Sequence, residues 1–250
     1  MGTLYSRCIG VLNSKGEYVV ALDNDDLFLF EELLEELYFI SKINYFDIVE
    51  IKSFNIPNYK PKYEEIENGY FIFHQNNLIL HQPELSSFCI SENDKINLKD
   101  HFVWGKSIRA KIYKKAINKL GKEKYYTYNC WTEDITIIFI IFNIAKSFIF
   151  LNLFGIFHLK DFSTTTYKLN NTHKLLSHIF YLGILFDFSK NEPKTKNLVA
   201  EYTLSFALHD LKELDEKNKR IFKSIIKKLN ECKYISYEYK QKLLSLNDSF

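Results

Sequence analysis

Three aspartates stand within four residues of one another, directly after a short apolar run. Residues 18–22 read YVVAL, and Asp23, Asp25 and Asp26 follow in the sequence DNDD. The apolar run predicts an interior strand. Carboxylates crowded at the end of a buried strand repel one another and are costly to desolvate. We therefore expect either a positive group beside them or a fully solvated turn, since Asp and Asn also favour turns. Carboxylate oxygens are the ligands that Mg²⁺ and Mn²⁺ take, often together with substrate phosphates.

A second pair of carboxylates opens the most apolar helix that the sequence predicts. Thr132 suits the N-cap, Glu133 and Asp134 fall in the first turn, and the helix to residue 145 includes the run IIFIIF. The helix dipole favours acidic residues there without any function. The functional interpretation is a general base, because a carboxylate beside a metal-bound phosphate ester can take a proton from an attacking hydroxyl.

A single histidine is the third candidate. His158 lies in GIFHLKDFSTTT, at the end of an apolar segment. A neutral imidazole can complete the coordination sphere of a metal. A lone histidine at such a position is more often structural, so both interpretations remain open.

Composition and charge restrict the class of protein. The 250 residues are 46% hydrophobic and 26% charged, which is typical of a globular protein with one sizeable core. The net charge of +2 predicts no nucleic-acid partner, since nucleic-acid binding usually needs a concentrated basic face. The four cysteines form no C-x-x-C pair, so neither a zinc site nor a disulfide framework is expected, and a reducing compartment is favoured.

No targeting signal is visible in the sequence. The start of the chain lacks a charged segment followed by an apolar block, so no signal peptide is predicted. The most apolar stretch, residues 135–159, contains Asn143, Lys146 and Asn152, which argues against a membrane span. We expect a cytoplasmic protein, with peripheral attachment to a membrane left open.

Hydrophobic periodicity predicts the elements that position these residues. After the strand at 18–22, Phe30, Leu33, Leu34, Leu37 and Ser41 fall at helical spacing, and residues 47–54 read as another strand. This order predicts a crossover unit with a parallel strand pair. A helix over 104–120 is expected to stop at Gly121. Short strands are predicted at 148–151 and 156–159.

The C-terminal third differs in character. Four segments, 173–188, 198–214, 216–229 and 236–246, have helical periodicity and many lysines. We predict two parts: an α/β domain over residues 1–168 and an all-helical extension over 169–250.

Taken together, these motifs resemble glycosyltransferase family 2, which has the GT-A fold. The N-terminal segment GTLYSRCIGVLNSKGEYVVALDNDDLF matches the family's order of Arg, short helix, Gly-Glu-Tyr turn and Asp-x-Asp-Asp. The segment Trp104-Gly105-Lys106 with Arg109 and Tyr113 is similar to a second family segment, and Thr132-Glu133-Asp134 to a third. The resemblance covers about residues 2–166 and implies a partial GT-A domain, Rossmann-like with a mostly parallel sheet.

The resemblance implies roles for these residues. Asp134 would be the catalytic base, with Glu133, Trp104, Lys106 and Arg109 in support. Asp23, Asp25, Asp26 and His158 would bind the donor, and Asp25 and Asp26 would hold a divalent cation, Mn²⁺ or Mg²⁺. The implied reaction is metal-dependent transfer with inversion, from a nucleotide sugar such as a UDP-sugar to a hydroxyl of a glycan, lipid or protein.

Two alternatives stay open. The family's domain normally begins upstream of Gly2, so the resemblance also implies a domain without its N-terminal nucleotide-binding part. Such a chain could be a catalytically inactive, glycosyltransferase-like protein that binds a partner. Haloacid dehalogenase-like phosphatases also end a strand in Asp-x-Asp, with Asp23 as the nucleophile, but Asp26 stands where that family has a small residue.

Overall fold

The structure is a computed structural model of the chain. It describes residues 2–56, 77–82, 84–85, 102–126, 133–159, 171–188 and 216–231, with single positions at 237, 240–241 and 244–245. Thr132 and the predicted helix at 198–214 lie outside the described residues, as do Cys89, Cys130 and Cys232.

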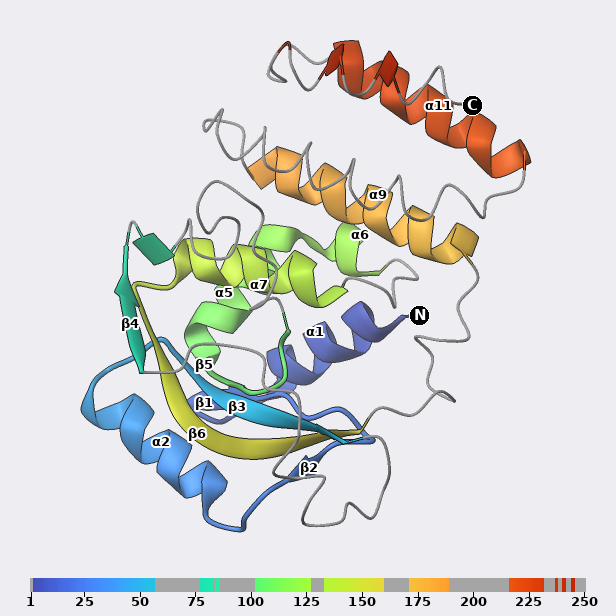
Figure 1. Ribbon diagram of the computed structural model, residues 1–250. Coiled ribbons are helices and arrows are strands. Elements are labelled where there is room, and N and C mark those ends of the chain that lie inside the picture. Colours follow the sequence, from blue (N-terminus) through green and yellow to red (C-terminus); the bar gives the residue numbers. More distant parts are fainter. Residues whose placement is uncertain are drawn as a thin grey trace.

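A curled sheet forms the centre of the molecule (Figure 1). The strands run in the order β1-β5-β3-β6-β2, and β4 also pairs with β6. Their bounds are β1 Tyr18–Val20, β2 Leu27–Phe28, β3 Ile48–Ile56, β4 Leu78–His81, β5 Lys106–Arg109 and β6 Ser147–Leu159.

The expectation of a mostly parallel sheet is wrong. Among the described strands, only β3 and β6 form a parallel ladder, whereas β1–β5, β3–β5, β2–β6 and β4–β6 are antiparallel. The first and second predicted strands do not pair, because β5 lies between β1 and β3. The sheet is therefore mixed: the long central strands are parallel, and shorter strands return beside them in the opposite direction.

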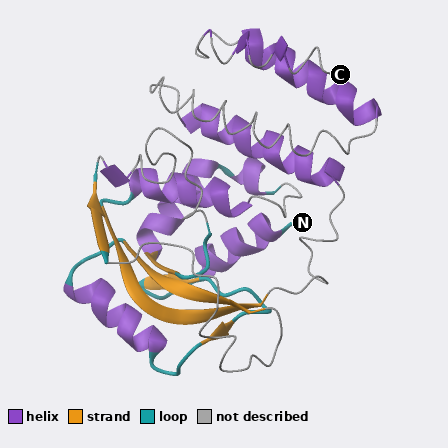
Figure 2. Ribbon diagram, viewed as in Figure 1, coloured by secondary structure: helices purple, strands orange, loops and turns teal. Residues whose placement is uncertain are grey.

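Helices cover both faces of the sheet (Figure 2). The helix α2 packs on one face, where it shares an apolar cluster with β3 and β6. On the opposite face, α1, α5 and α7 form the larger core, which also includes residues of α9. The helix bounds are α1 Thr3–Asn13, α2 Leu33–Ile43, α5 Ala110–Leu120, α6 Lys122–Tyr125, α7 Glu133–Ile144, α9 Asn171–Phe188 and α11 Glu216–Glu231.

Local periodicity predicted five of these helices correctly in kind: α2, α5 and α7, and also α9 and α11, which were expected over 173–188 and 216–229. The amphipathic α2 buries Leu33, Leu37 and Ser41, and α7 is buried at every position from residue 135 to 142. The helix expected over 104–120 begins only at Ala110, because the four residues before it form β5. Its predicted end at Gly121 is confirmed.

The two short strands expected near 148 and 156 are one long strand, β6. Gly155 lies within it, where α2 crosses closely. A Cβ atom at this position would stand 2.4 Å from Ile51 Cδ1 and 2.8 Å from Leu33 Cδ1. Only glycine lets α2 approach the sheet this closely without displacing these side chains.

The C-terminal part contains two described helices, α9 and α11. Tyr181, Ile184 and Leu185 of α9 are buried in the larger core. The residues around these helices are largely outside the described ranges, so the all-helical extension and its boundary at 168 stay predictions. Among the described residues, no helix is both long and apolar enough to cross a membrane.

Candidate functional site

Arg7 joins the two acidic motifs that are far apart in the sequence. Its Nη2 atom lies 2.7 Å from Asp23 Oδ1, at the end of β1. Its Nη1 atom contacts Asp134 and lies 3.4 Å from Glu133 Oε1, at the start of α7. The Arg7 side chain is 15% exposed. A positive charge therefore offsets the carboxylates, as the crowding of aspartates required, and this charge belongs to the chain itself.

Three local features place these groups together. Arg7 is in the middle of α1, whose buried side packs against α5 and α7 in the larger core. The chain turns after β1, where the Asp26 N–H donates to the Asp23 carbonyl at 3.1 Å. Glu133 and Asp134 are in the first turn of α7, where the helix dipole favours negative charge.

The environment of Glu133 differs from that of an exposed carboxylate. Burial raises the pKa of Glu133 above its usual value, while the charge of Arg7 opposes that rise. A carboxyl with a raised pKa, next to a fixed cation, is characteristic of a site that could exchange protons.

His158 is held by the third aspartate of the acidic turn. The antiparallel pairing of β2 with β6 sets Leu27 opposite Phe157, which brings Asp26 opposite His158. The His158 Nδ1 atom lies 2.9 Å from Asp26 Oδ1, and the Asp26 side chain is fully buried. The imidazole stacks on Trp104, with ring centroids 4.7 Å apart and 10° between the planes. Trp104 in turn forms a parallel bridge with Ala21, close to the end of β1.

This pairing favours the charged form of His158. Burial alone lowers the pKa of His158, but the hydrogen bond that its ring donates to Asp26 and the charges of Asp26, Asp23 and Asp25 raise it, and the net change is a rise. Protonated His158 thus offsets Asp26 much as Arg7 offsets Asp23.

Replacing His158 with glutamine is expected to lower the free energy of unfolding by about 2 kcal/mol at pH 6, the scale of a hydrogen bond between charged groups. Because the pKa is raised in the folded state, this stabilisation is complete below about pH 6.5, the unfolded value, and is lost as the pH rises through the folded value. Urea unfolding from pH 5.5 to 9 measures the difference. The exposed His81 of β4, changed to glutamine, is the control. A difference between wild type and variant that stays constant over this range would contradict the assignment.

Lys106 and Arg109, which were expected to support catalysis, make their described ion pairs with residues outside the two acidic motifs. Lys106 pairs with Glu50 across β5 and β3, at 3.0 Å, and both side chains are buried. Arg109 pairs with Asp47 at 2.9 Å and donates to the Phe46 carbonyl. The structure thus brings Asp23, Glu133 and Asp134 together through Arg7, and Asp26, His158 and Trp104 together in a second group.

Two charged residues of these ion pairs, Arg7 and Glu50, are not among the site residues predicted from the sequence. Arg7 was noted only as part of a resemblance, although an arginine on a helix that precedes an acidic turn is a signal for an ion pair. Glu50 lies in DIVEIKSF, where a charged residue inside an apolar strand signals a buried partner.

A cation site built from protein atoms alone is not seen in the part of the chain that the structure describes. No group of three or more His, Cys, Asp or Glu side chains there could hold a metal ion. Asp25 is partly exposed, whereas Asp26 is buried and pairs with His158 through its Oδ1 atom. The donor set fits a cation that takes one or two carboxylates and completes its shell from a bound phosphate.

Comparison with solved structures identifies the type of fold. S. aureus TarS 1–349 in complex with UDP-GlcNAc is similar with a TM-score of 0.62 and 12% identity, over 96% of this chain and 63% of that one. The same TarS fragment in complex with UDP is similar with a TM-score of 0.58 and 12% identity, over 97% of this chain and 65% of that one. S. aureus TarS is similar with a TM-score of 0.57 and 12% identity, over 93% of this chain and 37% of that one. The chain has a glycosyltransferase-like fold. It spans less than two thirds of the length of these TarS chains. No protein-family model and no curated protein matches this chain.

Proposed function

We propose that this chain binds a nucleotide sugar and transfers the sugar to a hydroxyl acceptor. The observation that carries the proposal is Arg7, which holds the acidic turn after β1 against the two carboxylates that open α7. A transferase needs a donor-binding group and a base on opposite sides of one reacting centre. The fold similarity to TarS, which binds UDP-GlcNAc, supports a UDP-sugar as the donor.

The acidic turn is the proposed donor site. We expect Asp25 and Asp26 to hold Mn²⁺ or Mg²⁺ together with the donor diphosphate, and Asp23 to lie beside it. The bound cation would supply positive charge that stabilises the departing diphosphate. His158 faces Asp26 through Nδ1, which leaves the Nε2–H of the protonated ring to donate a hydrogen bond to the donor diphosphate.

Asp134 is the proposed base. Its carboxylate accepts the proton of the acceptor hydroxyl, whose oxygen forms a bond to the anomeric carbon. The bond from that carbon to the diphosphate breaks on the opposite face, so the sugar is transferred with inversion and the nucleotide leaves. The acceptor is a hydroxyl of a glycan, a lipid or a protein.

Replacing Asp25 with alanine is expected to abolish metal-dependent UDP binding. Calorimetric titration of the purified chain with UDP should show an affinity at least about tenfold higher with Mn²⁺ than without it. The Asp25→Ala variant should lose that gain, because it removes a carboxylate with exposed surface from the proposed cation site. Asp187→Ala, an exposed carboxylate on α9, is the matched control and should bind as the wild type does.

Each failure has a distinct meaning. Equal UDP affinity with and without Mn²⁺ would contradict the metal but leave the donor site in place. Absence of UDP binding under every condition would contradict sugar transfer, and the chain would then be a glycosyltransferase-like protein that acts by binding a partner.

A further inference from the structure

The helix α5 contains four lysines and no acidic residue. Lys111, Lys115 and Lys119 recur at every fourth residue, which places them in one row along the helix, and all three are exposed. Like charges at this spacing repel one another and destabilise a helix. Lysine is almost never fully buried without a partner, so the composition of this row by itself places it at a surface.

The row continues beyond both ends of α5. Lys114 Nζ donates to the Ser14 carbonyl at 2.6 Å, which brings the exposed Lys15 beside α5. At the other end of the helix, Lys122 is exposed at the start of α6. We call this surface the lysine face, and it consists of Lys15, Lys111, Lys115, Lys119 and Lys122.

Within the part of the chain that the structure describes, no carboxylate forms an ion pair with the lysine face. Glu123 is the one acidic residue from position 110 to position 126. Asp187, on the neighbouring α9, is paired with Lys124 at 3.2 Å. The other lysine-rich helix, α11, differs, because it begins and ends with glutamate and pairs Lys219 internally at 2.8 Å. The positive charge of the lysine face is therefore available to a partner.

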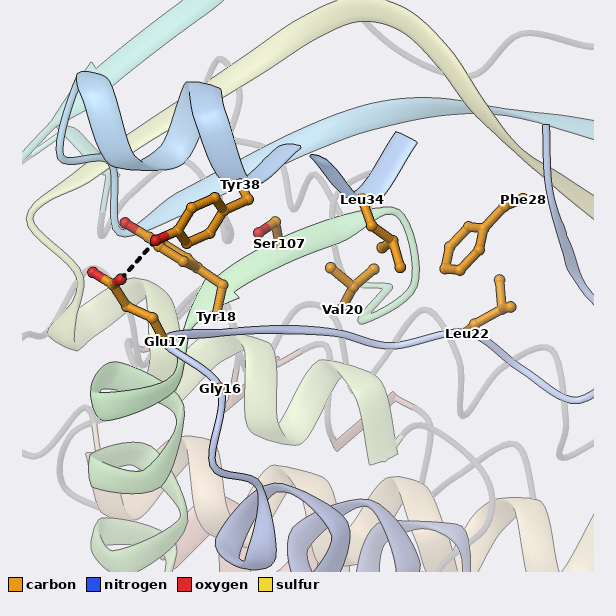
Figure 3. A pocket seen from close by; sticks show the side chains of 9 residues that line it. All are labelled: Gly16, Glu17, Tyr18, Val20, Leu22, Phe28, Leu34, Tyr38 and Ser107. Carbon is orange, nitrogen blue, oxygen red and sulfur yellow. Dashed lines mark hydrogen bonds between the residues drawn. The ribbon is translucent and has the colours of Figure 1, made fainter. Parts of the chain in front are cut away.

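The opposite side of the sheet offers no such charge. The helix α2 packs there (Figure 1), and Glu32, Glu35 and Glu36 are exposed at its start. A pocket of about 630 Å³ beside α2 is lined mainly by apolar side chains (Figure 3). Its one charged lining residue, Glu17, pairs with Lys42 at 2.9 Å. Positive charge on the α5 side and negative charge on the α2 side would orient the chain against a charged surface.

We propose that the lysine face docks the chain on a bilayer that contains anionic phospholipids, with α2 turned away from the bilayer. Clusters of lysines on an amphipathic helix are typical of segments that bind anionic lipid headgroups. Lysine is a point charge on a flexible stem, which suits headgroups that move in the membrane plane. Recognition of a defined phosphate or of nucleic acid favours the planar guanidinium of arginine, and no arginine is present from residue 110 to residue 126. The proposal does not depend on sugar transfer.

Co-sedimentation of the purified chain with lipid vesicles tests this surface. Vesicles of phosphatidylcholine mixed with phosphatidylglycerol should bind the chain, and vesicles of phosphatidylcholine alone should not. Raising the NaCl concentration from about 0.1 M to about 1 M shortens the Debye length from about 10 Å to about 3 Å and should release the bound chain. Sodium phosphate should release no more chain than NaCl of the same ionic strength, because the partner is a charged surface and not a single phosphate group.

A double variant assigns the binding to the lysine face. Lys111→Gln with Lys115→Gln should weaken binding to the mixed vesicles by about twenty-five-fold, since each lysine near such a surface contributes about fivefold. Lys42→Gln with Lys146→Gln is the matched control. It removes the same net charge at two exposed positions outside the lysine face and should bind as the wild type does. Circular dichroism should show unchanged helical content in both double variants.

Four results would overturn the proposal: no binding to the mixed vesicles at low salt, equal binding to both kinds of vesicle, equal losses in the two double variants, or specific release by phosphate. A labelled oligouridylate provides the test for a different partner. If the wild-type chain binds the oligouridylate but not the vesicles, and the Lys111→Gln, Lys115→Gln variant loses that binding, the lysine face binds nucleic acid and the membrane proposal is wrong.

Discussion

Replacing Asp134 with asparagine is expected to lower the rate of UDP release from UDP-GlcNAc by about a thousandfold, within the range for loss of a general base. The affinity for UDP should change by no more than about twofold, since the amide keeps the volume of the side chain and its oxygen can still accept a hydrogen bond from Arg7. The rate is measured by release of UDP at saturating donor, with added acceptor or with water, and the affinity by calorimetry.

The neighbouring Glu133 provides the matched control. It shares the contact with Arg7 and opens the same helix, but it is the carboxyl whose pKa is raised by burial. Glu133→Gln is expected to retain most of the rate. If Glu133→Gln abolishes turnover while Asp134→Asn retains it, the base is Glu133. If neither variant affects a measurable wild-type rate, the carboxylates that open α7 are not catalytic.

Replacing Lys106 with methionine is expected to lower the free energy of unfolding by about 4 kcal/mol, the scale for removing one partner of a buried ion pair. Lys106 and Glu50 face each other across β5 and β3 at 3.0 Å, and their side chains are 1% and 4% exposed. The single substitution leaves the Glu50 carboxylate buried without its cation. Urea unfolding followed by circular dichroism measures the loss.

The double variant Glu50→Leu with Lys106→Met separates charge from packing. It should recover most of the lost stability, because replacing both members of a buried ion pair by apolar residues is often neutral. Lys124→Met removes the more exposed pair with Asp187 and should cost less than about 1 kcal/mol. A double variant as unstable as the single one would show that the loss arises from packing and not from an unpaired charge.

The two acidic motifs show which features of the site can be predicted from local sequence and which cannot. Residue order alone shows that carboxylates follow a strand at residues 23–26 and that carboxylates open a helix at residue 133. Their proximity to each other is not, because it depends on Arg7 and on the packing of α1 against α7. Part of the positive charge expected beside the aspartates comes from the chain itself, because Arg7 pairs with Asp23 and His158 pairs with Asp26. The divalent cation expected at Asp25 and Asp26 stays a prediction.

The sequence by itself determined the elements whose signals are local. The apolar stripe of α2, the uniformly buried α7 and the end of α5 at Gly121 are each encoded within a dozen residues. Only the tertiary structure decided that β5 separates β1 from β3, that β2 brings Asp26 to His158, and that Glu50 meets Lys106. These pairings join residues far apart in the sequence. Each pairing depends on which strand edge is available and which buried charge needs a partner. No short segment of sequence determines either of these.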